Sequence, residues 1–593
     1  MNFCLFRKMS YLLIPAFLTL FALGCQSGSG LDESKIEKPE EINASIGEIS
    51  DIYQSGATEV RGYGIVANLA GTGSSECPDD LRDKLIKHIK VEMVDRQSID
   101  PEAFIKSKNT AVVEVYGVMP AAASKGDVFD LRVSPLSSTQ TTSLDGGRLF
   151  TTKLVAHREF FNFNQYLKTL ALAEGPIFIN KLSDKDTEKK GDYVLGGGRV
   201  VEDATITMIL NSPNYFTASA IRDVLNSQFG PNTARPKSPG EIDLNIPPKY
   251  QDQKAKFLAM VRMVYIGNDP EKYQARIKSL IDDLINNEDK LTPETGLETY
   301  GIAVVDRLAV LLDHPDEEVR LRAARCMLNN GDDRALVTLR KIIENPESKH
   351  RVEAVKAVGM SAKRSDALPI LARAIESEDF DVTLAAYEML VNLHDISVSR
   401  TAVAGDFFLD TVVYSGPDRI YLTRKGTPRV VLFGEPLNCE KDIFVQVDDG
   451  ELILNSRPAD KYVSISRKKP KNPGIIGPVP SRRKVKDVIR TLGELPKVPE
   501  KSFRRPGLFV PYCDIAVVLE KMCTNGAIKA DFIAGDLPDF PSGEMPDTDF
   551  LNPSENPNSD GQDAGQRGSD TEGSNRQNRR DWEELLEGRR QQG

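Results

Sequence analysis

Short alternations of apolar and polar residues indicate that the first half of the chain mixes strands with helices. Residues 79–92 instead place apolar side chains three or four positions apart, as on one face of a helix. The predicted strands are 60–73, 110–120, 127–136 and 204–210. One helix is predicted over 79–92, and a second, short helix is predicted to end at Gly230-Pro231. We therefore expect a mixed α/β part over residues 50–268.

Helical periodicity takes over from residue 299 to residue 396, and the pattern repeats. Matching apolar positions recur every 31 residues, at Ala323, Ala354 and Ala385 and again at Met327, Val358 and Met389. Each unit reads as two helices whose apolar faces are too wide to be buried alone, so that stacking of neighbours is needed to bury them. The pattern resembles HEAT-type repeats, with about three hairpins forming a binding scaffold. An irregular helical bundle is the alternative.

Strands return after the repeats and are followed by two helices. Residues 419–456 hold four apolar runs that are typical of strands. Amphipathic helices are predicted over 484–495 and 514–526, and residues 527–535 read as a closing strand. The chain thus has a second mixed part after its repeats.

The N-terminus has the pattern of an export signal. Arg7 and Lys8 precede an apolar run that is shorter than the roughly 20 residues of a membrane-spanning helix. The run ends in Ala22-Leu23-Gly24-Cys25, which resembles a bacterial lipobox, although Ala22 stands where leucine is usual. We expect lipid attachment at Cys25, with ordinary cleavage or an uncleaved anchor as alternatives. Residues 25–49 then form a flexible tether.

The C-terminus has the composition of a disordered tail. From residue 537 onward Pro, Gly, Ser, Asn and Asp dominate, and such a segment cannot bury enough apolar surface to fold. The chain's only tryptophan, Trp582, lies in this tail. It belongs either to a frayed end or to a short peptide that docks on a partner.

Composition narrows the classes of function. The 593 residues carry 76 Lys and Arg against 87 Asp and Glu, a formal charge of −11, which argues against nucleic-acid binding. The five histidines are scattered, and no HExxH, Gly-x-Ser-x-Gly or phosphate-loop motif is complete. We predict no catalytic residue, no metal site and no cofactor. Export places Cys77, Cys326, Cys439, Cys513 and Cys523 in an oxidising compartment, where an odd number leaves at least one unbridged.

A series of glycine-rich motifs resembles the bacterial flagellar P-ring protein family. The motifs are Arg61-Gly62-Tyr63-Gly64-Ile65-Val66 with Gly71-Thr72-Gly73, then Ala111 to Val115, Met119-Pro120, Lys125-Gly126-Asp127, Ser143 to Leu149 with Gly146-Gly147, Ala171 to Pro176 and Gly197 to Val200. Their order along about 220 residues follows the family. Residues 481–495 and 511–532 are similar to its last helices and closing strand. The helical repeats then appear as an insertion between the two parts.

This resemblance implies a structural protein that forms a homo-oligomeric ring around the flagellar rod in the periplasm. The implied partners are other copies of the chain, rod and L-ring proteins and the peptidoglycan layer. The lipid at Cys25 would add the outer membrane, and the partner of the repeats is unknown. A ring needs a head-to-tail interface that closes by rotation. The motif glycines would serve either close approach of neighbouring backbones or only tight turns.

The family also implies a cysteine near Gly526. Cys523 lies one helical turn earlier, which suggests a disulfide between Cys439 and Cys523, with free buried thiols as the alternative. An outer-membrane lipoprotein adaptor, with a P-ring-like core and partner-binding repeats, is the rival function.

The predicted fold class is α+β, with P-ring-like mixed domains interrupted by an α-solenoid. The expected organisation is a signal peptide (1–24), a tether (25–49), a P-ring-like N-terminal part (50–268), a helical connector (269–298), HEAT-like repeats (299–396), a P-ring-like C-terminal part (397–536) and a disordered acidic tail (537–593).

Overall fold

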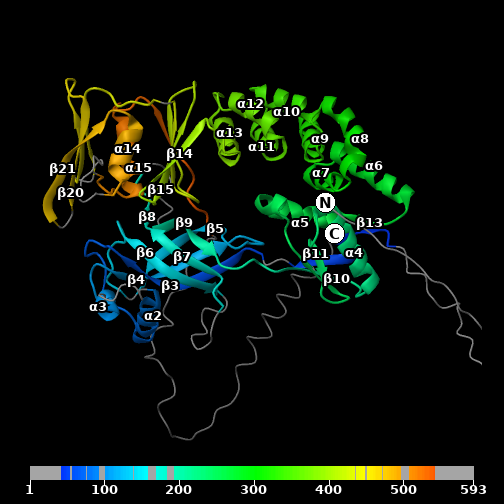
Figure 1. The fold of residues 1–593 in the computed structure, drawn as a ribbon, viewed down its shortest axis with the longest axis horizontal. Helices are drawn as coiled ribbons and strands as arrows, with labels where there is room; N and C mark the ends of the chain where they lie inside the picture. The colour runs from blue at the N-terminus through cyan, green and yellow to red at the C-terminus, as the bar shows by residue number, and fades with distance from the viewer. Residues whose placement is uncertain are drawn as a thin grey trace, which may run out of the picture. The chain divides into compact units, whose positions relative to one another are not determined.

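A computed structural model gives the fold of the protein (Figure 1). It describes residues 42–53, 56–74, 76–92, 100–137, 139–157, 168–182, 192–434, 436–447, 451–469, 472–495 and 507–540. The predicted signal peptide, Cys25, most of the tether and residues 541–593 with Trp582 lie outside the described residues. The chain divides into two compact units, residues 1–53 with 207–306 and residues 54–206 with 307–593, and each is described by itself.

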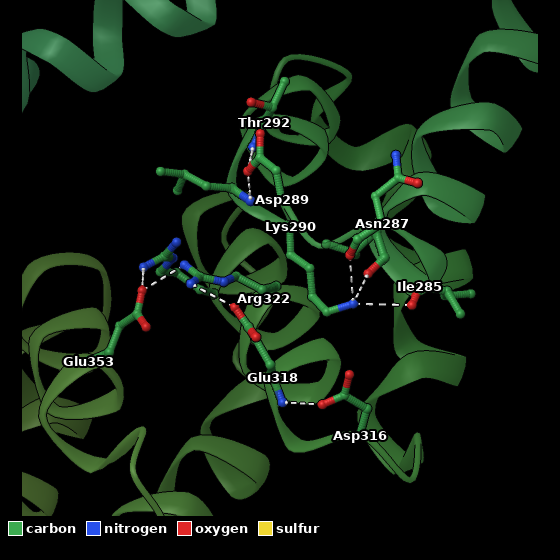
Figure 2. A network of polar contacts seen from close by, with 12 residues as sticks. Ile285, Asn287, Asp289, Lys290, Thr292, Asp316, Glu318, Arg322 and Glu353 are labelled. Atoms are coloured by element: carbon green, nitrogen blue, oxygen red, sulfur yellow. Dashed lines mark hydrogen bonds and ion pairs between the residues drawn. The ribbon is translucent and has the colours of Figure 1, made fainter.

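The first unit is built on a four-stranded sheet in the order β11-β12-β10-β2. Its elements are β1 (Ala44–Ser45), α1 (Ile46–Ile49), β2 (Ser50–Tyr53), β10 (Ile206–Leu210), α4 (Tyr215–Phe229), β11 (Ala234–Pro236), β12 (Glu241–Leu244), η4 (Pro248–Gln253), α5 (Lys254–Met263), β13 (Tyr265–Ile266), α6 (Pro270–Asn286), α7 (Leu291–Glu298) and η5 (Gly301–Val304). Lys290 caps the C-terminal end of α6. Its ammonium donates to the carbonyl oxygens of Leu284, Ile285 and Asn287 at 3.3, 3.1 and 3.1 Å (Figure 2).

The predicted tether boundary at residue 49 is wrong. Residues 44–49 belong to the first unit, because Ile46 is fully buried and the Ser45 amide donates to the Glu48 carboxylate at 2.9 Å. Ile46 and Ile49 are three positions apart, but the pattern covers too few residues to predict an element.

The second unit opens with a closed antiparallel barrel. Its strands are β3 (Thr58–Ala67), β4 (Ala111–Met119), β5 (Val128–Pro135), β6 (Arg148–Ala156), β7 (Ala171–Pro176) and β9 (Asp192–Val200), with β8 (Phe178–Ile179) paired to β9. The strand order is β5-β4-β3-β6-β7-β9, and β9 pairs back to β5 to close the circle. Alternate side chains such as Val113, Val115 and Leu131 fill the interior. Helices α2 (Asp79–Glu92) and α3 (Pro101–Ile105) pack against the outside through a separate apolar cluster.

Glycines allow the barrel wall to bend. The β3–β6 register runs through Arg61↔Val155 and resumes at Val66↔Leu149, so β6 carries one residue more than β3 between these pairs. A Cβ atom on Gly62 would lie 2.3 Å from the Lys153 carbonyl oxygen, and β6 crosses β3 closely at this bulge.

The repeats form the predicted three hairpins. Their helices are α8 (Val305–Ala309) with η6 (Val310–Asp313) and α9 (Glu317–Asn329), then α10 (Ala335–Glu344) and α11 (Arg351–Ser361), then α12 (Arg364–Ala374) and α13 (Phe380–Asn392). Polar contacts join positions about one repeat apart. Arg322 contacts Glu353 at 2.6 Å and Glu318 at 3.1 Å (Figure 2), and Ser348 donates to Glu317 at 2.5 Å. The stack is therefore joined by hydrogen bonds and ion pairs as well as by its apolar core.

The C-terminal part holds two sheets with helices between them. One sheet has the order β14-β15-β17-β16-β22, and the other has the order β18-β19-β20-β21. The elements are β14 (Val398–Val403), β15 (Phe407–Val412), β16 (Arg419–Leu422), β17 (Arg429–Phe433), β18 (Ile443–Val447), β19 (Leu452–Ser456), β20 (Tyr462–Lys469), β21 (Asn472–Arg482), α14 (Val485–Gly493), α15 (Tyr512–Thr524) and β22 (Asp531–Ala534).

Sequence patterns found β16, β17, β18, β19 and β22 of this part and missed β14, β15, β20 and β21. Of the missed strands, β14 and β21 are sheet edges, and β21 contains Pro473, Pro478 and Pro480, which a strand tolerates at a sheet edge. The predicted start of the tail at residue 537 is also wrong. Leu537 is buried in the core of this part, and the Phe540 ring stacks on Tyr193 with centroids 6.0 Å apart.

The close approach of β6 to Gly62 of β3 leads to a testable prediction. Gly62→Ala places its Cβ against the Lys153 carbonyl and should lower the free energy of unfolding by about 1–3 kcal/mol, as measured by denaturant titration. Gly56→Ala is the matched control, because a Cβ there meets nothing within 4 Å. Equal stability of the two variants would contradict this role for Gly62.

Candidate structural site

The barrel and the C-terminal part share one hydrophobic core. Phe178 and Tyr193 of the barrel strands belong to the same buried cluster as Ile420, Val430 and Leu519 of the C-terminal part. The rings of Phe178 and Tyr512 lie 6.0 Å apart between centroids. Two segments separated in sequence by the repeats are thus one folded body, and their burial cannot be completed separately.

An ion-pair cluster crosses this joint. The Lys181 ammonium, which follows β8, contacts Asp145 at 2.6 Å and Asp514 of α15 at 2.7 Å. Burial lowers the pKa of Lys181, but the charge of Asp514 and the hydrogen bonds to Asp145 and Asp514 act together with Cys513 in the opposite direction, and the pKa is raised. Lys181 therefore stays charged and holds the loop after β8 against the first turn of α15.

Two further contacts join the same parts. The Asp130 carboxylate of β5 accepts hydrogen bonds from the Gly196 amide at 2.7 Å and the Gly426 amide at 2.9 Å. Arg148 of β6 pairs with Asp406 at 2.8 Å. The contacts of Asp130, Arg148 and Lys181 come from β5, from β6 and from the loop after β8, so the joint resists rotation as well as separation.

Potential metal ligands gather at the joint. Asp145, Cys513 and Asp514 each offer a ligand atom within 4.8 Å of the others, the one such group among the residues that the structure describes. The Lys181 ammonium contacts both carboxylates of this group. Because a cation already neutralises these carboxylates, the geometry is that of a structural ion pair, and it does not point to a metal centre.

The last repeat helix is fixed to the C-terminal sheet through a buried carboxylate. Asp410 of β15 is fully buried, accepts a hydrogen bond from the Tyr387 hydroxyl of α13 and receives the Arg400 guanidinium at 2.9 and 2.7 Å. Burial raises the pKa of Tyr387, and the Asp410 charge raises it further, so the phenol remains a donor. The carboxylate thus has partners from the repeats and from its own sheet.

Aromatic packing surrounds this carboxylate. The Phe433 ring of β17 lies 5.7 Å from Tyr387, 6.0 Å from Phe380 and 5.7 Å from Tyr414, centroid to centroid, in edge-to-face geometry. The Arg419 guanidinium donates to the Glu378 carbonyl at 2.9 Å. The repeats are therefore an arm of the second unit that packs against the β14-β15-β17-β16-β22 sheet.

The repeats also contain an open cavity of about 350 Å³ between α10 and α12. Its lining includes Ile343 and Ile370, and Arg373 at its rim pairs with Glu344 at 3.0 Å. Arg351, also in the lining, donates to Ser377 at 2.9 Å. These two arginines are already engaged within the repeats.

Two residues of the P-ring-like motifs meet on the barrel wall. Arg61 pairs with Glu114 at 2.9 Å, both side chains are buried, and the guanidinium lies 5.4 Å from the Tyr116 ring centroid. Burial raises the pKa of Glu114, and the Arg61 charge opposes that rise. The two motifs thus carry a buried ion pair that joins adjacent strands.

The motif glycines divide into two structural roles. A Cβ on Gly64, Gly73 or Gly147 would lie 2.0–2.5 Å from atoms of the same chain, as for Gly62, whereas Gly71 and Gly146 adopt φ values of +82° and +69° in turns. The sequence left two roles open for these glycines, tight turns or close approach between neighbouring subunits. The close approaches described here are all within one chain.

The cysteines predicted to pair lie in the same region as free thiols. Cys439 is buried, Cys523 packs against the same core, and the pKa of each is raised to about 12, chiefly by burial. The bridge stays a prediction. Sequence reasoning missed Asp410, Tyr387 and Lys181. A lone aspartate within the apolar run FFLDTVV was the available signal for Asp410, and Lys181 gave none.

Comparisons with known proteins identify both kinds of domain. Residues 45–278 match the family model described as Flagellar P-ring protein, and residues 304–395 match HEAT repeats. The resemblance to the P-ring family and the prediction of HEAT-type repeats are thereby confirmed, as is the mixed fold with a helical repeat region.

Similar curated proteins carry the same name. The flagellar P-ring protein of Desulfotalea psychrophila is 29% identical over 252 residues, covering 39% of this chain and 60% of that protein. That of Bdellovibrio bacteriovorus is 29% identical over 241 residues, covering 39% and 67%. That of Helicobacter pylori strain 26695 is 25% identical over 338 residues, covering 54% and 87%. The chain spans about 60% of the length of the first of these relatives.

The contacts of Asp410 with Tyr387 and Arg400 lead to a second testable prediction. Asp410→Ala leaves the Tyr387 hydroxyl and Arg400 without their acceptor and should destabilise the docking of α13 by about 1–3 kcal/mol. Hydrogen exchange should accelerate in α13 and β15 and remain unchanged in barrel strands β3 and β4. Ser399→Ala on exposed β14 is the control. Unchanged exchange in α13 would show that the carboxylate does not hold the repeats.

The carboxyl group of Asp192 should make the stability of the fold depend on pH. Burial raises the pKa of half-buried Asp192 to about 6, helped by the Asp145 carboxylate, from an ordinary value of 3.8. The folded state then binds more protons than the unfolded state between about pH 4 and 6, so stability falls as pH rises through that window. Asp192→Asn should be more stable than wild type at pH 7.5, and this advantage should disappear below about pH 4.

The measurement is the thermal unfolding midpoint of each protein between pH 4 and 7.5. Glu347→Gln changes an exposed carboxyl and serves as the control. An advantage of Asp192→Asn that is constant across the pH range would exclude the proposed titration.

Proposed function

We propose that this chain, whose residues 45–278 match the flagellar P-ring family, is a structural subunit of a periplasmic ring in the flagellar basal body. The observation that carries the proposal is the family-matched barrel, which shares one buried core with the C-terminal part. A subunit that surrounds a rotating rod must keep its shape under load. The contacts of Lys181, Asp130 and Arg148 supply such rigidity.

The HEAT repeats extend this subunit with a partner-binding arm. Their attachment through Asp410 and Phe433 fixes the arm to the ring body, so a protein held by the repeats would be placed at a constant position around the ring. Repeats of this kind present extended surfaces for protein binding. We propose an envelope protein as the partner, together with rod and L-ring proteins on the ring body.

The N-terminal residues suggest where in the cell the protein is found. We propose that residues 1–24 direct export and that Cys25 carries the lipid that holds the ring subunit at the outer membrane. Among the described residues, no helix is long and apolar enough to cross a membrane.

Export would also expose the cysteine pair to oxidation. Cys439 and Cys523 pack against one core, and we propose that they form a disulfide in the mature protein. Since burial raises both thiol pKa values, few thiolates form at neutral pH. The bond would therefore form during folding, before the core closes. Such a bond would close a loop of about 85 residues and add about 4 kcal/mol.

Purified hook–basal bodies test the proposed function. We expect mass spectrometry to find the chain there at a stoichiometry similar to that of rod and L-ring subunits, and to find none in a strain deleted for this chain. Peptide masses from the same sample should show an acylated Cys25 and a bridged Cys439–Cys523 pair. Recovery of the chain only in detergent-solubilised membranes would contradict the ring function and favour a lipoprotein adaptor.

A further inference from the structure

Strand β14 is an exposed edge of the C-terminal sheet. It pairs only with β15 among the described strands, and its four middle residues, 399–402, are all exposed. Soluble proteins normally protect such edges with proline, unpaired charge or a covering segment. β14 contains no proline, and its one charged side chain, Arg400, turns to Asp410 of its own sheet. By contrast, the edge strand β21 contains Pro473, Pro478 and Pro480.

The backbone of β14 has hydrogen-bonding groups that face outward. The Ser397 carbonyl accepts a hydrogen bond from the Val413 amide, which makes Ser397 and Val413 a hydrogen-bonded pair of the antiparallel ladder. Every second pair along the register is then bonded in the same way, including Thr401 with Leu409. Antiparallel pairs alternate between bonded and non-bonded positions, so the N–H and C=O groups of Arg400 and Ala402 point away from β15. Within the described chain these amides show no backbone partner.

The opposite edge of the same sheet is β22. Asp531 donates to Asp418 and Gly535 donates to Leu422 on the β16 side, which leaves the amides of Phe532 and Ala534 facing outward. Strand directions follow from the pairings: β14 opposes β15, β15 runs parallel to β17, β17 opposes β16, and β16 runs parallel to β22. The two free edges, β14 and β22, therefore run in the same direction.

We infer that β14 of one subunit pairs with β22 of a second copy, so that the five-stranded sheet continues from subunit to subunit. Two different edges of one sheet that run in the same direction form a head-to-tail contact, and repeating one rotation closes such contacts into a ring. The backbone groups supply the affinity, as in other cases of strand addition. This interface rests on the proposed function only in requiring a ring.

Cysteine cross-linking tests the contact directly. The registers Ala402↔Phe408 and Arg419↔Asp531 place Ala402 and Asp531 on the same face of the sheet, and both side chains are exposed. Within one copy they are separated by four strand spacings, about 19 Å, too far for a short bismaleimide. The full chain carrying both Ala402→Cys and Asp531→Cys should give a ladder of cross-linked multimers in cells. Each single variant, with native cysteines retained, is the control.

A backbone variant provides the second test. Ala402→Pro removes an outward-facing N–H while sparing the β15 ladder. In the otherwise native chain, Ala402→Pro should reduce ring recovery about tenfold or more, whereas Ala402→Val keeps the N–H and should not. Circular dichroism establishes that each variant folds.

The outcomes separate the interface from the ring function. No ladder in the double variant, with the native chain present in hook–basal bodies, would overturn the β14–β22 contact and leave the ring function intact. A ladder in cells whose hook–basal bodies lack the chain would support the contact and contradict the flagellar role. Normal ring recovery with folded Ala402→Pro would also overturn the inference.

Discussion

The structure depends on burial that neither the barrel nor the C-terminal part can complete alone. The barrel region supplies Phe178, Leu182, Tyr193 and Leu195 to a core whose remaining members come from residues beyond 400. The long stretch of chain between the barrel and the C-terminal part is compatible with this constraint because the residues on either side of it, 54–206 and 397–540, belong to the same unit. Loop-closure entropy grows only slowly with the length of inserted chain. The repeats have their own core, which offsets the cost of ordering them.

Attachment of the repeats converts an insertion into an arm. A helix connected only by its ends would leave one face of the β15–β17 sheet in water. Here Tyr387 and Phe380 cover that face, and Asp410 is satisfied by donors from both sides. A buried carboxylate with several donors fixes orientation more than it adds stability, because its desolvation offsets much of the gain. Orientation is what an arm on a ring subunit requires.

The sequence predicted those features that have a period or a motif. The 31-residue spacing of Ala323, Ala354 and Ala385 gave the repeats, and helix α2 was found at its full extent because its apolar positions are regular. Closure of the barrel through β5 and β9 was beyond sequence reasoning, since strand order depends on non-local pairing. Lys181 and Asp514 lie 333 residues apart and meet where the barrel packs against the C-terminal part. The short buried segments at residues 44–49 and 537–540 lie in polar stretches, where one or two buried residues leave no periodic pattern.

The central claim is that the barrel, the C-terminal part and the repeats form one rigid subunit of a flagellar ring. Single-particle electron microscopy of purified hook–basal bodies tests it most directly. The account predicts a ring around the rod whose repeating unit contains the closed barrel, the two C-terminal sheets and a helical arm in a constant position. A ring in which barrel and sheets are present but the arm has no constant position would contradict the rigid subunit. Absence of this fold from the ring would contradict the flagellar role.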